Sequence, residues 1–199
     1  VYRNDGNGVF TSLGLVTETL GYASVAWADM DNDGRLDGVV SGSTDFSSSG
    51  AKTYVLRNTD GTHFAESAIL TNASGFGGQM AVGDMNGDGR MDIVTVGATS
   101  SGAFVLNVLR NQGSLNFSNQ VYGAFSLRSA SLSLGDYDGD GDLDVAVMGT
   151  PDGVTANGRV LVLDNVDELE GSEGAVLLDG LVRHAPERLH FVLAGRGDP

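Results

Sequence analysis

The sequence contains no cysteine, only three prolines and a single lysine, Lys52. Without cysteine, neither a disulfide framework nor a zinc–thiolate site is possible. So little lysine, together with a formal net charge of −15, argues against a surface that binds nucleic-acid phosphates. No apolar run approaches the ~20 residues of a membrane-spanning helix. Glycine is abundant instead, at 30 of 199 residues, which is typical of an all-β protein with many tight turns.

The negative charge is concentrated in three nine-residue windows. Twelve of the 20 aspartates lie at 29–37, 84–92 and 136–144, and these windows have formal charges of −3, −2 and −5. They read DMDNDGRLD, DMNGDGRMD and DYDGDGDLD, and they begin 55 and 52 residues apart. Aspartates at this density repel one another unless a cation lies among them. The windows therefore predict metal-binding loops.

Each window belongs to a longer repeat. A short apolar segment precedes it and another follows, so the window is predicted to join two strands of a hairpin. A second motif recurs with about the same period: YRN at 2–4, LRN at 56–58 and 109–111, and LDN at 163–165. One unit of about 53 residues then contains four short strands, which is the layout of a β-propeller blade.

The repeats predict an all-β fold, an incomplete β-propeller arc of about three four-stranded blades. Residues 1–19 supply the last two strands of a partial blade, 20–73 and 74–127 supply two whole blades, and 128–165 supply a blade without its fourth strand. Such an arc does not close a ring of normal propeller size. Because unpaired strand edges seek partners, we expect self-association through the open edges, with capping of one edge by the apolar segment 189–194 as the alternative.

The windows share the pattern D-x-[DN]-x-D-G-x-x-D. Side-chain oxygens at positions 1, 3, 5 and 9 and the backbone oxygen of position 7, with water, match the six to eight oxygens that calcium takes. Zinc would favour histidine or cysteine, and magnesium prefers fewer protein ligands. The expected ligands of three Ca²⁺ sites are Asp29, Asp31, Asp33, the backbone oxygen of Arg35 and Asp37; Asp84, Asn86, Asp88, the backbone oxygen of Arg90 and Asp92; and Asp136, Asp138, Asp140, the backbone oxygen of Asp142 and Asp144.

An EF-hand loop begins in the same way and has to be distinguished. It requires an acid at position 12 and a helix on each side. Position 12 is occupied here by Val40, Thr95 and Val147, and the flanking residues are alternating and β-branched. The windows are therefore predicted to be β-hairpin loops.

The most specific segments are VAWADMDNDGRLDGVV, MAVGDMNGDGRMDIVTV and LSLGDYDGDGDLDVAVMG, with YRNDGNGVF at the start. They resemble the FG-GAP/VCBS repeats of bacterial surface proteins and of integrin α-subunit propellers, over residues 1–165. The resemblance implies a calcium-stabilised, non-catalytic propeller, secreted or on the cell surface, that serves adhesion or binds a protein or glycan ligand. The sequence begins at Val1 within a predicted strand and shows no signal peptide, so we expect it to be a piece of a longer chain.

Residues 166–199 depart from the repeat. Helical spacing over 173–185, followed by an apolar strand, predicts a short α/β tail. Residues 159–199 resemble a fragment of the LuxR/MalT-type STAND ATPases, with VLVLDNVDEL as a Walker B strand around Asp164 and FVLAGRGDP as a strand that ends in a sensor arginine, Arg196. The phosphate loop G-x-x-x-x-G-K-[ST] is missing, because the only lysine follows an alanine, so no ATPase activity is expected.

A carbohydrate-active enzyme, or the accessory domain of one, is the alternative function, since some propellers of this kind accompany hydrolases or lyases. A catalytic pair would need carboxylates in a cleft, outside the metal loops. The candidates are Glu18, Asp45, Glu66 and Asp152, and no G-x-S-x-G motif supports a nucleophilic serine.

The single tryptophan, Trp27, precedes the first aspartate window by one residue. The same position is occupied by Val82 and Leu134 in the next two repeats. This equivalence predicts that Trp27 is a core residue and not a platform for stacking a sugar.

Overall fold

The computed structural model describes residues 1–14, 17–70, 76–99, 101, 103–124, 127–137, 139–151, 159–163 and 191–193. Apart from one short 3-10 helix, η1 (Ser48–Gly50), all regular secondary structure in this part of the chain is β-strand. No helix among these residues is long and apolar enough to cross a membrane. The expected all-β fold class is confirmed.

The strands form four sheets in chain order, one two-stranded and three four-stranded. The sheets consist of β1 (Tyr2–Gly6) and β2 (Val9–Ser12); β3 (Gly21–Ala28), β4 (Asp37–Ser43), β5 (Ala51–Asn58) and β6 (Phe64–Leu70); β7 (Phe76–Gly83), β8 (Asp92–Ala98), β9 (Phe104–Asn111) and β10 (Phe117–Ala124); and β11 (Leu127–Gly135), β12 (Asp144–Pro151), β13 (Arg159–Leu163) and β14 (Phe191–Leu193).

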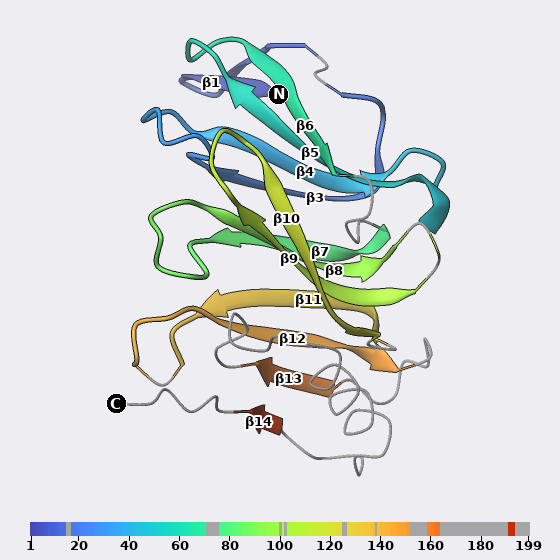
Figure 1. Ribbon diagram of the computed structural model, residues 1–199. Coiled ribbons are helices and arrows are strands. Elements are labelled where there is room, and N and C mark those ends of the chain that lie inside the picture. The colour runs from blue at the N-terminus through green and yellow to red at the C-terminus, as the bar shows by residue number, and fades with distance from the viewer. Residues whose placement is uncertain are drawn as a thin grey trace.

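The sheets are stacked and do not close into a ring (Figure 1). Strand β7, the first of its sheet, contacts β3 and β11, the first strands of the two neighbouring sheets. The loops that carry the three aspartate windows lie on one side of the stack (Figure 1). This arrangement is the predicted incomplete propeller arc, while the division of the chain at residues 19, 73, 127 and 165 stays a prediction.

The strands and turns follow from local sequence. β1 and β2 are joined by Asn7 and Gly8, whose φ angles of 51° and 78° suit a tight hairpin turn that needs positive φ at both positions. The first strand of each four-stranded sheet has the same register irregularity, at 21–24, 76–79 and 128–131. A bulge repeated at equivalent positions indicates that the three repeats share one backbone design.

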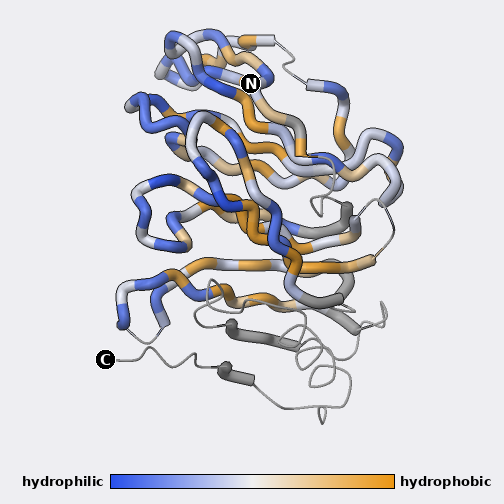
Figure 2. Tube along the Cα trace, in the orientation of Figure 1, coloured by the Kyte–Doolittle hydropathy of each residue, from blue (hydrophilic) through white to orange (hydrophobic). Residues whose placement is uncertain are grey.

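Two hydrophobic cores lie between neighbouring sheets. One core packs the sheet β3–β6 against the sheet β7–β10 and includes Met30, Val39 and Ile93. The other packs the sheet β7–β10 against the sheet β11–β14 and includes Val94 and Val145. Figure 2 shows hydrophobic residues along the strands and hydrophilic residues in the loops with the aspartates. Each sheet therefore buries its apolar faces only by stacking on its neighbours.

The expectation that Trp27 is a core residue is wrong. Its residue surface is 48% exposed, and its ring contacts Phe64 with the ring centroids 5.7 Å apart. Its counterparts Val82 and Leu134 are partly buried in the two cores between sheets. Within the described residues, a preceding four-stranded sheet packs against Val82 and Leu134, whereas only the short, exposed hairpin of β1 and β2 lies before the sheet that contains Trp27.

The C-terminal part of the chain contributes one described strand. The predicted apolar strand at 189–194 is present over Phe191–Leu193 as β14, which pairs parallel with β13 through three residue pairs. The last sheet thus has a fourth strand from the tail, as in the capping alternative. The expected helix at 173–185 and the ATPase-like residues Asp164 and Arg196 lie outside the described residues.

The two cores generate a prediction for a matched pair of valines in one sheet. Val108→Ala removes two methyl groups from the core beside the last sheet and is expected to lower the free energy of unfolding by about 2 kcal/mol. Val121→Ala, at an exposed position of β10, is expected to change it by less than about 0.5 kcal/mol. Urea denaturation measures both, and equal losses would contradict the assignment of this core.

Candidate metal centre

The first aspartate of each window shapes its loop. Both of its carboxylate oxygens accept hydrogen bonds from backbone N–H groups within the loop, and the glycine at position 6 has a positive φ of 80–102°. The donors are Asp33 and Gly34 for Asp29 (3.0 and 2.8 Å), Asp88 and Gly89 for Asp84 (3.1 and 2.8 Å), and Gly139 and Gly141 for Asp136 (2.7 and 3.2 Å). Glycine is needed at this position because other residues rarely adopt positive φ.

The last aspartate of each window is buried. Its Oδ2 accepts the N–H of the second loop residue, at 2.9 Å for Asp37, 3.1 Å for Asp92 and 2.6 Å for Asp144. The Oδ1 atoms of Asp37 and Asp92 each accept the N–H of the last residue of the third strand, both at 2.7 Å. Burial raises the pKa of Asp37 and Asp92, although these hydrogen bonds act in the opposite direction.

The residues that donate from the third strand, Asn58 and Asn111, have a structural role that sequence analysis missed. The side-chain amide of Asn58 donates to the backbone oxygen of Leu36 at 3.1 Å. That of Asn111 donates to Met91 at 3.2 Å and also to Met30 of the preceding repeat at 2.8 Å. The recurrence of the Arg-Asn motif at about the same period as the windows was the available signal.

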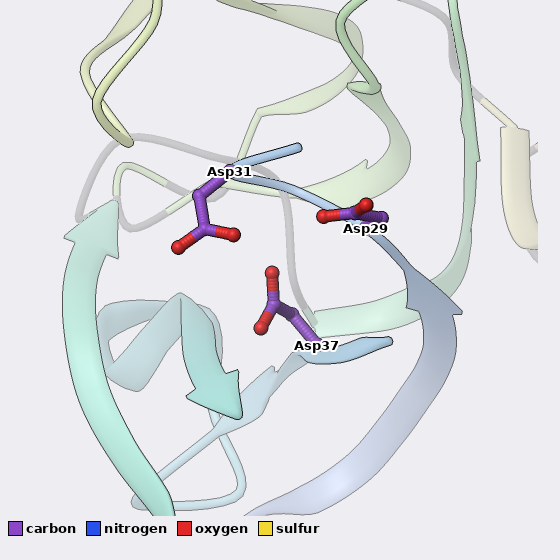
Figure 3. Close-up of side chains that lie close together, drawn as sticks. All are labelled: Asp29, Asp31 and Asp37. Carbon is purple, nitrogen blue, oxygen red and sulfur yellow. The ribbon is translucent and has the colours of Figure 1, made fainter. Parts of the chain in front are cut away.

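The first loop brings three carboxylates together. Asp29, Asp31 and Asp37 each offer a carboxylate oxygen, and these atoms lie within 4.8 Å of one another. Figure 3 shows the three side chains around a common space. The Oδ1 atom of Asp31 is buried and has no hydrogen-bond partner. A buried oxygen without a donor is unfavourable by about 1–3 kcal/mol, and a bound cation would satisfy it. The all-oxygen donor set therefore fits a hard cation such as calcium.

In the first two loops, the aspartate at position 5 forms an ion pair with an arginine. The carboxylate of Asp33 pairs with the guanidinium of Arg35 and lies 3.5 Å from that of Arg57, which also pairs with Asp31 at 2.5 Å. In the second loop Asp88 pairs with Arg90. The sequence predicted a role for the backbone oxygens of Arg35 and Arg90 but none for their guanidinium groups. The contacts of Arg57 were not predicted, although its recurrence in the Arg-Asn motif was an available signal.

The remaining predicted ligands are placed as follows. The side-chain amide of Asn86 donates to Asp88 at 3.0 Å, and its oxygen accepts the Asp88 N–H at 3.3 Å. Asp140 accepts the N–H of Asp142 at 2.9 Å, and Oδ1 of the buried Asp144 has no hydrogen-bond partner. Asp138 lies outside the described residues. Within the described part of the chain, only the first loop has three acidic groups as close as 4.8 Å.

The carboxylates considered for catalysis are held in other ways. Glu18 accepts hydrogen bonds from Lys52 Nζ at 2.6 Å and from the Tyr54 hydroxyl at 2.9 Å. Asp45 accepts from the hydroxyls of Ser49 and Ser47 at 2.6 and 2.9 Å. These bonds lower the pKa of both carboxyls, whereas a general acid requires a raised pKa. Glu66 is exposed on β6, and Asp152 lies outside the described residues.

The sequence matches the model of one known protein family. A family model described as FG-GAP-like repeat matches residues 1–40, 39–95 and 96–147. Each matched segment contains one of the three aspartate windows, and together they cover about three quarters of the chain. No curated protein matches the chain. The match ends before residue 159, so nothing here supports the ATPase-like resemblance of residues 159–199.

The contacts of Asn111 generate a prediction that uses two adjacent amide side chains. Asn111→Ala leaves the backbone oxygens of Met30 and Met91 without this donor and is expected to lower the free energy of unfolding by about 1–3 kcal/mol. The control is Gln112→Ala at the neighbouring exposed position, with an expected change below about 0.5 kcal/mol. Urea denaturation in EDTA compares them without a metal contribution. The role given to Asn111 fails if the two variants are equally stable.

Proposed function

Because the chain belongs to the FG-GAP-like repeat family, we propose that it is a calcium-binding β-propeller module that binds an extracellular protein or glycan without catalysis. The observation that carries the calcium part is the group of convergent carboxylates of Asp29, Asp31 and Asp37, with the buried, unpartnered oxygen of Asp31 among them. The same pattern in the second and third loops extends the proposal to three sites, with the ligands predicted from the sequence.

Calcium suits this site better than magnesium or zinc. Its ligands are oxygens in sets of six to eight, whereas magnesium keeps several waters and zinc favours nitrogen and sulfur. When bound, the ion supplies positive charge that offsets the repulsion among the carboxylates. Asp37 also accepts the N–H of Asn58, so a cation at the loop would act directly on a side chain that reaches the third strand. Calcium binding and blade stability are thus coupled in this proposal.

The expected modest affinity for calcium favours an extracellular setting. Calcium sites of extracellular modules have dissociation constants near ~10⁻⁴–10⁻³ M and are filled at extracellular calcium concentrations. In this chain the arginines on Asp33 and Asp88 compete with a cation for carboxylate oxygens, which favours modest affinity at the first two loops. The absence of cysteine is compatible with this setting because the bound ions, and not disulfides, would supply the stabilising cross-links.

An aromatic pair supports ligand binding at the strand ends remote from the aspartate loops. Tyr22, near the start of β3, and Phe46, in the loop after β4, are exposed, and their rings meet edge to face with centroids 6.2 Å apart. Both have positive φ, 50° and 58°. Bulky residues with positive φ are strained and cluster at functional sites. Exposed aromatic rings suit stacking on a sugar or packing on a peptide.

A glycan array probed in calcium and in EGTA tests the binding part, with Phe46→Ala as the variant that removes one ring. Capture that requires calcium and Phe46, without cleavage of the captured glycan, is the expected result. An array of extracellular matrix proteins, probed in the same way, covers a protein ligand. Hydrolysis of the glycans would instead identify the alternative enzyme.

Calcium is expected to raise the midpoint of thermal unfolding. Binding to the folded state alone contributes ~2.7 kcal/mol per site at a hundredfold excess over the dissociation constant. Melting in calcium, in magnesium and in EGTA should place the midpoint highest in calcium. A midpoint that is the same in calcium and in EGTA rules out the calcium proposal.

Removal of one loop carboxylate is expected to remove one site and leave two. Asp31→Ala takes away a member of the convergent group, so isothermal titration with calcium should fall from three sites to two. Asp60→Ala removes a carboxylate that lies in the turn after β5 and binds Thr62 and His63. It is expected to keep all three sites, and an unchanged stoichiometry in Asp31→Ala would show that the first loop holds no ion.

A further inference from the structure

A layer of buried polar side chains lies between the first two four-stranded sheets. Ser41 and Thr53 belong to the sheet β3–β6, and Thr95 and Asn107 belong to the sheet β7–β10. Ser41 is 3% exposed, and the other three residues are 0% exposed. We propose that this polar layer is an internal hydration site, in which Asn107 holds at least one ordered water molecule between the two sheets.

Strand periodicity places the polar layer on the facing sides of the two sheets. Ser41 pairs with Thr53 across β4 and β5, and Thr95 pairs with Asn107 across β8 and β9. Each of the four stands two positions along its strand from a residue of the core between these sheets. Those core residues are Val39, Val55, Ile93 and Leu109. Because side chains two positions apart lie on the same face of a sheet, the polar layer continues this core.

The equivalent layer between the second and third four-stranded sheets is apolar. The equivalent positions of the repeat are occupied by Val96, Leu106, Val147 and Leu161. The register is the same, because Val96 pairs with Leu106 and Val147 pairs with Leu161. Val96, Leu106 and Val147 are buried in the core between those sheets. All four positions are therefore polar in one contact between sheets and apolar in the other.

Asn107 carries the argument for a bound molecule. Its Oδ1 and Nδ2 atoms are both buried, and neither has a hydrogen-bond partner among the described residues. The residue lies in the middle of β9, between the two sheets and away from the ends of the strand. A buried amide without hydrogen bonds is strongly unfavourable, so such groups are satisfied by other protein groups or by ordered water.

Water is the molecule that satisfies both atoms of the amide. Nδ2 of Asn107 donates hydrogen bonds and Oδ1 accepts them. A cation would satisfy only Oδ1 and an anion only Nδ2, and the polar layer contains no charged side chain that would offset the desolvation of an ion. A buried water typically makes about three hydrogen bonds and can both donate and accept.

The polar layer also supplies further partners and room. The hydroxyl of Thr53 donates to that of Ser41 at 2.9 Å, and hydroxyl oxygens can accept more than one hydrogen bond. Ser41 and Thr53 each have one heavy atom fewer than their apolar counterparts, Val96 and Leu106. A buried water requires a site that is both polar and roomy. We therefore expect the water to lie between Asn107 and these smaller side chains.

NMR spectroscopy of the whole chain in calcium tests the site. Nuclear Overhauser effects from long-lived water to the side-chain amide of Asn107 are expected. Asn119, exposed on the neighbouring strand β10, is the control within the same molecule, and its amide should contact only rapidly exchanging surface water. A folded chain in which Asn107 shows no contact with long-lived water overturns the proposal.

A matched pair of variants and a crystal structure test the role of Asn107 in holding the water. Asn107→Leu introduces the residue of the equivalent position 161 and should abolish the contacts between long-lived water and the Thr95 methyl group, whereas Asn119→Leu should keep them. Retention of these contacts in Asn107→Leu contradicts the role of Asn107. If that variant does not fold, a crystal structure of the wild-type chain decides, with water expected about 2.7–3.2 Å from Oδ1 or Nδ2. An amide of Asn107 that contacts only protein atoms there would overturn the proposal.

Discussion

The repeat depends on the buried aspartate that ends each loop. In the first two repeats this carboxylate accepts one backbone N–H from its own loop and another from the end of the third strand. One side chain therefore joins the first hairpin of the blade to its third strand. A buried carboxylate is costly unless it is hydrogen-bonded, and the raised pKa of Asp37 and Asp92 shows that cost. The other aspartates of each window lie in the same loop as this anchored carboxylate.

Charge differs among the three otherwise similar loops. In the first two, a guanidinium lies against the carboxylate at position 5. The third has Asp142 where the others have arginine, and its window has a formal charge of −5. Because like charges in one loop repel one another, the third loop gains most from a bound cation under the proposed function. The repeats thus share a backbone design and differ in how much of their charge the protein itself balances.

Stacking accounts for both the cores and the open faces. A single blade cannot bury its apolar faces, so the sheet β7–β10 is covered by the sheet β3–β6 on one face and by the sheet β11–β14 on the other. Within the described residues, the sheets β3–β6 and β11–β14 each have one face that no other four-stranded sheet covers. Trp27 is exposed for this reason, although its position in the repeat is a core position.

The sequence by itself determined the features that repeat locally. The aspartate windows, the alternating strands and the Arg-Asn motif predicted the all-β arc, the hairpin loops and the family, because turn chemistry and strand periodicity act over a few residues. The tertiary structure decided what depends on contacts between repeats. Neither the exposure of Trp27 nor the bond from Asn111 to Met30 follows from periodicity, since each depends on which sheet lies alongside. The predicted tail strand likewise acquired its parallel partner, β13, only in the folded chain, because pairing across so many residues has no local signal.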